Sequence, residues 1–380
     1  TPANFISSTP PVVSSTGGTP GFSLTSTTGA TLAPFTIGMA LIEGQFPGSI
    51  GVSGVASGQA VVRNTWPDGS AKFAVISGRA TVTAGTSTTA TLTRNGATGT
   101  SLTESDLTAT GVAATLQFGG GLTMSLASLI GVAASGASSG VITAGRARTL
   151  VSGPTMSSWL YCAPLSASNP HIIGWMEVRL YVGGAVHVLP WVENGWVRVT
   201  GPASVVGDLT FTLGGTTRFT QASVHLCHHG RVVAQDVAGV GYWLGTAPDL
   251  YAAPDPEYIQ STGLVPTYFA DTSGATTRLN ALSQSYSPAN YGQLLASPRD
   301  GGGNGTNNGD FDAGMANAGY HAGIGPLPEW DAFYMTSGAD VRAWKAVVAN
   351  AMGYGRYAVH QRDELTLAPV NPADVPLKTL

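Results

Sequence analysis

The chain has 380 residues, of which 43% are hydrophobic and only 10% are charged, and its formal net charge is −4. Because an ordinary soluble domain carries about 25% charged residues, we expect hydroxyl and amide side chains to solubilise this surface. The negative balance excludes the basic footprint of a nucleic-acid-binding protein. No run approaches the roughly 20 apolar residues of a membrane-spanning helix, and the length predicts two or three domains.

The N-terminus and the cysteines bear on where the protein is located. The first residues lack the basic segment and the apolar core of a signal peptide, so we expect either that a signal has been removed or that the protein leaves the cell inside a virion. We therefore predict a virion, extracellular or cell-surface location. Cys162 and Cys227 fit no metal-binding spacing, and the sequence allows two buried thiols, which we favour, or one disulfide.

Residues 1–30 are rich in Thr, Ser, Pro and Gly and hold few large apolar side chains. Ordering a backbone costs about 1–2 kcal/mol per residue, which so little apolar surface cannot offset. The composition predicts an extended arm that is ordered by contact with a neighbouring subunit.

A first all-β domain is predicted over residues 31–150. Short runs of β-branched or alternating residues, separated by turn residues, are typical of a barrel or sandwich. They occupy residues 35–41, 60–65, 72–76, 80–83 and 88–93. Gly, Ala and Ser dominate residues 119–145, which predicts weak strands and loops there rather than a helix.

A β-sandwich is predicted over residues 151–250, with strands at 173–182, 186–192, 196–200, 209–213 and 222–226. This region holds the aromatic residues Trp191, Trp196, Tyr242 and Trp243. Aromatic side chains at this density normally fill a sandwich core, which is the interpretation we favour. The alternative is an exposed platform on which a glycan stacks.

Residues 251–380 are predicted to form an irregular connection, because prolines recur and a tract rich in Gly and Asn follows at 300–310. Val341, Trp344, Val348 and Ala351 fall on one face of a helix. Their spacing predicts one main helix over about 338–352.

Trp66, Pro67, Asp68 and Gly69 predict a tight turn within residues 59–76, since proline presets one φ angle and glycine admits a positive one. Together with residues 35–44, this hairpin resembles the RIFT-like barrel that opens the rhamnogalacturonan exo-lyase-like family, which includes many phage-encoded proteins. The resemblance extends over most of the chain through residues 228–231, 242–245, 258–259, 265–268, 325–334 and 362–366.

The resemblance implies a mainly β protein with an N-terminal RIFT-like β-barrel, then a β-sandwich. It further implies a short, mostly irregular or helical C-terminal region that resembles the start of an α/α toroid. The sequence has room for about one helical hairpin there, so a C-terminally truncated form is expected. In the lyase relatives the toroid carries much of the active-site groove, and we therefore expect this chain to lack the scaffold for catalysis.

Two groups of side chains could hold a metal ion. His225, Cys227 and His229 would share one face of a strand, but a closed zinc site needs four ligands, so we favour a buried thiol between hydrogen-bonded histidines. Oxygen ligands for calcium recur in a glycine-rich loop, namely Asp300, Asn304, Asn308, Asp310 and Asp312. The loop fails the EF-hand template, so we favour a solvated loop and predict no cofactor, with calcium as the alternative.

Acid–base chemistry on a polysaccharide would need a base and a cation near a sugar carboxylate. His360, Arg362 and Asp363 could supply them, but such a run is more often an ion-paired corner, which we favour. The other candidate groups are His321 and the carboxylates of Glu177, Glu193, Asp236, Glu257, Glu329, Asp331 and Glu364. The sequence holds no Gly-x-Ser-x-Gly elbow, phosphate loop or dinucleotide fingerprint.

These observations predict a non-catalytic structural protein of a virion, such as a phage tail or surface component. We expect it to assemble with other subunits, to form a homo-oligomer and to contact host polysaccharide. Two alternatives remain open: a polysaccharide lyase-like enzyme or a fragment of one, and a filament protein of a bacterial surface. A shared fold does not transmit activity, so these functions must be distinguished by the chemistry of a site.

Overall fold

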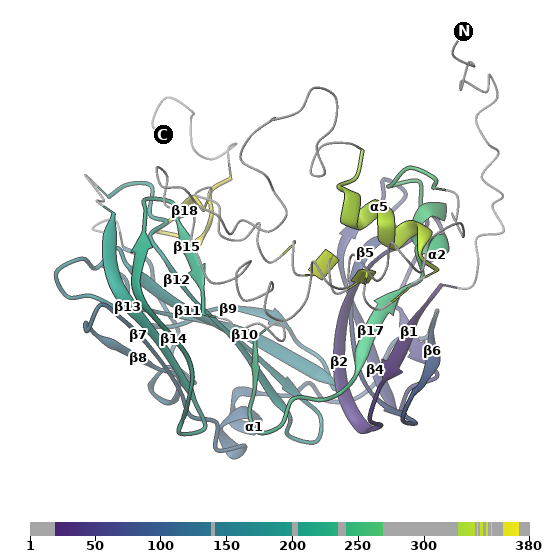
Figure 1. The fold of residues 1–380 in the computed structure, drawn as a ribbon, viewed down its shortest axis with the longest axis horizontal. Coiled ribbons are helices and arrows are strands. Elements are labelled where there is room, and N and C mark those ends of the chain that lie inside the picture. The colour runs from purple at the N-terminus through teal and green to yellow at the C-terminus, as the bar shows by residue number, and fades with distance from the viewer. Residues whose placement is uncertain are drawn as a thin grey trace, which may run out of the picture.

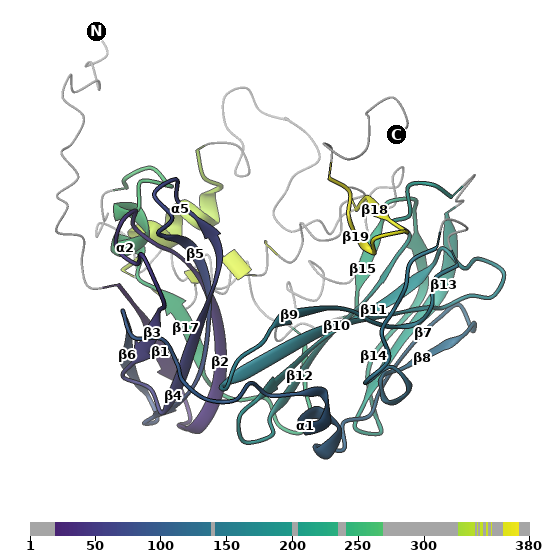
Figure 2. The same cartoon turned by 180° about the vertical axis from the view of Figure 1, so that it is seen from behind.

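The computed structural model describes residues 20–137, 141–199, 204–234, 241–268, 326–338, 340, 343–344, 347–348, 351 and 360–371. The protein is mainly β, as the sequence predicts. Two β cores lie side by side, and the chain passes between them more than once (Figures 1 and 2). In the part of the chain that the structure describes, no helix is long and apolar enough to cross a membrane.

The first core lies between two antiparallel sheets, with strand orders β17-β1-β6-β3 and β2-β5-β4. The strands are β1 (Gly21–Ser26), β2 (Ala30–Ala40), β3 (Gly51–Ser53), β4 (Ser57–Thr65), β5 (Ala71–Val82), β6 (Thr86–Thr93) and β17 (Tyr251–Pro254). The two sheets adjoin at both edges, where β3 contacts β4 and β17 contacts β2. Alternate side chains such as Phe35 and Ile37 on β2 are buried between them.

The prediction of an extended arm over residues 1–30 is wrong for the part that the structure describes. β1 is a central strand that pairs with β6 on one side and β17 on the other. Phe22 and Leu24 are 1% and 0% exposed, because alternation places both on the face that packs against the second sheet. β1 is buried in part because β17, from residues 251–254, pairs with it. The composition of residues 1–30 does not reveal this distant partner strand. Residues 1–19 lie outside the described residues.

The predicted turn joins β4 to β5. The Gly69 amide donates to the Trp66 carbonyl at 2.9 Å, and the Trp66 amide donates to the Ser70 carbonyl at 2.8 Å. Gly69 has φ +84°, a conformation that glycine adopts without strain. Trp66 is half-buried, and its indole N–H donates to the Leu41 carbonyl at 2.9 Å. The tight turn with Trp66 packed at the rim of the first core is therefore confirmed.

The second core is a β-sandwich between sheets of order β14-β13-β7-β8 and β15-β12-β11-β10-β9, with β16 also paired to β12. The strands are β7 (Ala114–Phe118), β8 (Thr123–Ser125), β9 (Gly145–Val151), β10 (Met156–Pro164), β11 (Ile173–Tyr181), β12 (Val186–Glu193), β13 (Val205–Leu213), β14 (Thr216–Leu226), β15 (Arg231–Val233) and β16 (Tyr242–Trp243). Met176, Val178 and Leu180 alternate along β11 and are buried against the opposite sheet.

The boundary predicted at residue 150 is wrong. β7, β8, β9 and the helix α1 (Glu104–Ala109) belong to the second core, where Leu107 and Phe118 pack in one cluster with Trp159. The chain therefore leaves the first core soon after β6, and it returns at β17, where an irregular connection was predicted. The described part of residues 119–145 carries the short β8 and the 3-10 turn η1 (Leu126–Ser128), which confirms the prediction of weak structure there.

Two helices lie against each other beside the first core, α2 (Pro256–Ser261) and α5 (Glu329–Thr336) (Figures 1 and 2). The Tyr334 hydroxyl donates to the carbonyl of Pro254 and thereby attaches α5 to the end of β17. Neither helix was predicted. In the helix predicted over 338–352, the described residues that are helical are Ala343, Trp344, Val347, Val348 and Ala351.

The last described segment packs on the second core rather than the first. β18 (Arg362–Asp363) pairs with β19 (Ala368–Pro369) in a small hairpin. A β-bridge between Trp196 and Arg362 and the ion pair of Arg362 with Glu193 join this hairpin to the sandwich. The strand predicted at 196–200 is wrong for the described residues 196–199, which hold this bridge but no strand.

Candidate functional site

A groove opens where the two cores meet, and it consists of two adjoining cavities. The first has a volume of about 420 Å³, and the second has a volume of about 320 Å³. Thr36 of β2 and Arg179 of β11 line both. We call the first the aromatic pocket, which is lined among others by Phe35, Arg179, His187, Arg218, Tyr242, Trp243 and Tyr251. We call the second the arginine pocket, which is lined among others by Arg63, Arg148, Glu177 and Arg179.

The strand register of the six-stranded sheet places four of the lining residues, His187, Arg179, Glu177 and Arg148, on one face. His187, Arg179 and Ser158 form one cross-strand row over β12, β11 and β10. Leu189, Glu177, Leu160 and Arg148 form the adjacent row, which continues onto β9. Since alternate residues of a strand point to opposite faces, the buried residues between them fill the sandwich core and these rows face the first core.

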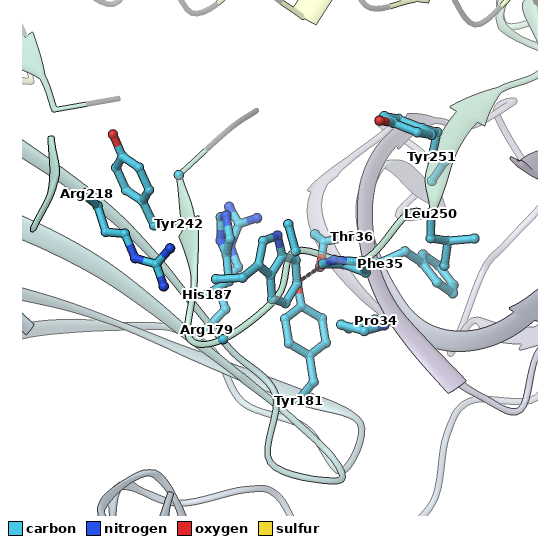
Figure 3. Close-up of a pocket in the computed structure, with 16 residues that line it drawn as sticks. Pro34, Phe35, Thr36, Arg179, Tyr181, His187, Arg218, Tyr242, Leu250 and Tyr251 are labelled. Carbon is cyan, nitrogen blue, oxygen red and sulfur yellow. Dashed lines mark hydrogen bonds between the residues drawn. The ribbon is translucent and has the colours of Figure 1, made fainter. Parts of the chain in front are cut away.

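Hydrogen bonds fix the two walls of the groove relative to each other. The hydroxyls of Thr36 and Tyr181 hydrogen-bond across the junction at 2.7 Å, as Figure 3 shows. Gln59 of β4 is buried, and its amide side chain accepts from the backbone N–H groups of Thr155 and Met156 at 2.7 and 2.9 Å and donates to the Met156 carbonyl at 2.7 Å. Both cores therefore hold the groove in a defined geometry before any ligand binds.

Trp243 is the aromatic residue best placed to contact a ligand in the groove. Its ring is half-buried and lies 4.7 Å from the His187 ring and 5.6 Å from the Tyr181 ring, measured between centroids. Figure 3 shows His187 and Arg218 on the side of the second core, with Leu250 and Tyr251 across from them. The aromatic pocket thus combines ring faces with cationic groups.

The groove carries a surplus of positive charge. Arg63, Arg148, Arg179 and Arg218 line it, whereas Glu177 is the one carboxylate among the lining residues. Glu177 accepts from Arg179 at 2.6 Å. Burial alone would raise the pKa of the Glu177 carboxyl, but the Arg179 guanidinium opposes this and the net pKa lies below its usual value.

The other arginines of the groove make no direct ion pair within the described chain. The side chains of Arg148 and Arg218 make no hydrogen bond there either, and Arg218 holds a buried Nε without a partner. Arg63 donates only to the backbone carbonyl of Leu150. A guanidinium without a carboxylate partner is a strong donor to a carboxylate or sulfate group of a ligand.

Most of the predicted glycan-stacking residues are core residues. Trp191, Trp196 and Tyr242 are 8%, 1% and 6% exposed. Trp191 and Trp196 both contact Trp175, with ring centroids 6.2 and 6.4 Å apart. The platform alternative is wrong for these residues, because Trp191 and Trp196 are buried in one cluster with Leu367 of the C-terminal hairpin, whereas Tyr242 is buried in the sandwich core against Phe211. Trp243 alone of the predicted set is half-buried in the groove, and Tyr242 contributes to its lining.

The predicted catalytic candidates form the ion-paired corner that the sequence favoured. Arg362 is buried and donates to Glu193 at 2.6 Å, while Asp363 lies 3.5 Å from the exposed Arg198. His360 donates its backbone N–H to the carbonyl of His229 at 3.0 Å. None of these residues lines the groove. Of the remaining carboxylates, Glu177 alone lies in the groove, and His321 and Asp236 lie outside the described residues.

The alternative of a zinc site at His225, Cys227 and His229 finds no support among the described residues. β14 ends at Leu226, and Cys227 begins a turn in which the Gly230 amide donates to the Cys227 carbonyl, so the strand alternation stops before His229. Among the described residues, no three His, Cys, Asp or Glu side chains lie close enough to hold a metal ion. The calcium candidates Asp300, Asp310 and Asp312 lie outside the described residues. Cys162 and Cys227, which are both described, form no disulfide.

Sequence reasoning missed the groove arginines and His187. One local signal was present, because Glu177, Arg179 and His187 interrupt two strands that are otherwise apolar except for Glu193 at the end of β12. Charged side chains on a buried strand face are rarely found without a partner or a ligand. No protein-family model matches this chain, and no curated protein sequence matches it either.

Proposed function

We propose that this protein is a non-catalytic structural component of a virion or cell surface that binds an acidic saccharide in the groove. The observation that carries the proposal is that the guanidinium of Arg218, unpaired within the described chain, lines the same pocket as the half-buried ring of Trp243. A sugar ring presents an apolar face that packs on an aromatic ring, and its carboxylate or sulfate accepts from arginine. Apolar walls with a few placed polar groups are typical of ligand sites.

Binding to immobilised polysaccharides tests this function. We expect retention on polygalacturonate or hyaluronan and none on neutral dextran at physiological ionic strength. Arg218→Ala should weaken binding about 10- to 100-fold, since a hydrogen bond to a charged group contributes about 1.5–3 kcal/mol. Arg94→Ala is the matched control, because this arginine lies on the first core outside the groove and donates to the Gln45 carbonyl. Equal binding of acidic and neutral polymers would refute the proposal.

The structural part of the proposal is supported by composition. A surface with so few charges and so many hydroxyl and amide groups suits close packing between copies of a chain. We therefore expect a homo-oligomer in solution, measured as molar mass by light scattering on a sizing column. A monomer at every concentration up to the solubility limit would contradict the assembly role and leave the glycan-binding test unaffected.

A second candidate function is β-elimination on the bound acidic saccharide. It is favoured by the position of the His187 imidazole, which lines the same pocket as two arginines and Tyr242. An imidazole can take the C5 proton beside a sugar carboxylate while guanidinium groups stabilise the resulting charge. The C4–O bond then breaks, the C4=C5 double bond forms, and the leaving oxygen takes a proton from the imidazolium or from water. Incubation with polygalacturonate decides between the two functions. A steady rise in absorbance of the unsaturated product that His187→Ala abolishes would establish the enzyme.

A further inference from the structure

We propose that the arginine pocket is a second anion subsite, so that the groove binds two acidic groups of one saccharide chain at once. The inference rests on the proposed function, since it concerns a ligand that already occupies the aromatic pocket. The ligand class is therefore an oligosaccharide with repeated carboxylates, rather than a single acidic sugar.

The charges divide the groove into two centres. Arg218 lies on one side, and Arg63 and Arg148 lie on the other. Arg179 lines both pockets and is engaged at 2.6 Å with Glu177, which lines the arginine pocket, and this pair carries no net charge. Because a neutral ion pair separates the two cationic centres, the groove fits a ligand with two separate anionic groups better than a ligand with one continuous charge.

The arginine pocket has donors that are ready for an acidic group. Arg148 is exposed, and its side chain makes no hydrogen bond or ion pair within the described chain. Arg63 is anchored through the Leu150 carbonyl, which restrains its side chain and leaves other guanidinium N–H groups for a ligand. Both are exposed to solvent, so an acidic group can approach without a change in the fold.

The spacing of the centres sets the length of the ligand. The paired rows run from His187 on β12 through β11 and β10 to Arg148 on β9. Neighbouring strands are about 4.8 Å apart, so the backbones of these two residues, which also lie in adjacent rows, are separated by three strand spacings or more, at least about 14 Å. A monosaccharide cannot occupy both pockets, whereas a short oligomer can. Linking two weak sites in one ligand raises affinity without any new type of contact.

Isothermal titration with linear galacturonic-acid oligomers, from the dimer to the octamer, tests the second subsite. We expect affinity to rise by about tenfold or more at the length that first reaches both pockets. Arg148→Ala should abolish this step, so that long oligomers bind no better than short ones. Arg218→Ala should weaken binding at every length while the step persists. Arg94→Ala is again the matched control, because it removes one exposed arginine outside the groove. It should change neither the affinity nor the step in its dependence on oligomer length.

The outcomes separate this inference from the proposed function. A smooth length dependence without a step, or a step that survives Arg148→Ala, overturns the second subsite while binding in the aromatic pocket stands. Absence of binding at every length overturns the proposed function and the second subsite with it. A lower slope of affinity against salt concentration in Arg148→Ala, with a folded protein by circular dichroism, would support the electrostatic origin of the step.

Discussion

Arg362 and Glu193 form a buried ion pair that joins the last described segment to the second core, with Arg362 Nε 2.6 Å from Glu193 Oε1. Arg231 donates to the other carboxylate oxygen at 2.7 Å. Burial alone would raise the pKa of Glu193, but the two guanidinium groups outweigh it and hold the pKa below its usual value. The Arg362 guanidinium also lies 4.2 Å from the centre of the Trp175 ring, so the ion pair packs against an aromatic side chain as well.

Replacing Arg362 should destabilise the second core strongly. In Arg362→Met the carboxylate of Glu193 stays buried with one partner fewer, and breaking a buried pair costs about 3–5 kcal/mol. Urea unfolding followed by tryptophan fluorescence measures the change. The control is Arg198→Met, whose exposed contact with Asp363 at 3.5 Å should contribute no more than about 1 kcal/mol. Similar losses of unfolding free energy in both variants would show that the buried ion pair contributes no more to stability than the exposed one.

Gln59 should determine how firmly the two cores are joined. Gln59→Leu keeps the size of the side chain but leaves the amides of Thr155 and Met156 without their acceptor. Each unsatisfied buried group costs about 1–3 kcal/mol, so we expect a loss of several kcal/mol in denaturant unfolding together with weaker glycan binding. Gln117→Leu, on the exposed face of β7, should change neither. An unchanged affinity in a destabilised Gln59→Leu protein would exclude a role of the joint in shaping the groove.

The half-buried Asp331 of α5 should make stability fall as pH rises. Burial raises the pKa of Asp331 from 3.8 to about 6 in the folded protein. Between these values the folded state binds the proton more tightly than the unfolded state, so the stabilising effect is complete below pH 3.8 and is lost as pH rises through about 6. Asp331→Asn should therefore raise the melting temperature at pH 7 and have little effect at pH 4. An equal shift at both pH values would refute this linkage.

Local sequence patterns predicted the strands that pair with near neighbours. β2, β4, β5 and β6 are close to their expected positions, and the turn at Gly69 follows from its own chemistry. β5 was predicted as two short strands because Gly78 interrupts the apolar run. In the structure the strand is continuous, since a Cβ at Gly78 would lie 2.5 Å from the Phe35 ring, and the glycine makes room for that ring.

Long-range pairing was not visible in the sequence, and the groove depends on it. β17 is a four-residue strand next to prolines, and it becomes a strand because β1, more than 200 residues earlier in the chain, lies beside it. The four groove arginines are spread over residues 63–218 and follow no motif. The register of β9 to β12 aligns Arg148 and Arg179, whereas Arg63 of β4 and Arg218 of β14 reach the groove because their sheets pack beside this one.

A glycine in the groove wall should prove essential for the position of His187. Gly241 has φ +74°, and a Cβ there would lie 2.7 Å from His187 Nε2 and from the Val188 carbonyl oxygen. Gly245 has a similar φ of +83° but open space around its Cα. Both alanine variants incur the strain of a left-handed conformation, about 1–2 kcal/mol, whereas Gly241→Ala alone also displaces the imidazole. We therefore expect Gly241→Ala to unfold at lower denaturant than Gly245→Ala and to shift the His187 ring resonances in the NMR spectrum, which Gly245→Ala should leave in place. Equal stability of the two variants with unmoved His187 resonances would show that the imidazole is not held by this close approach.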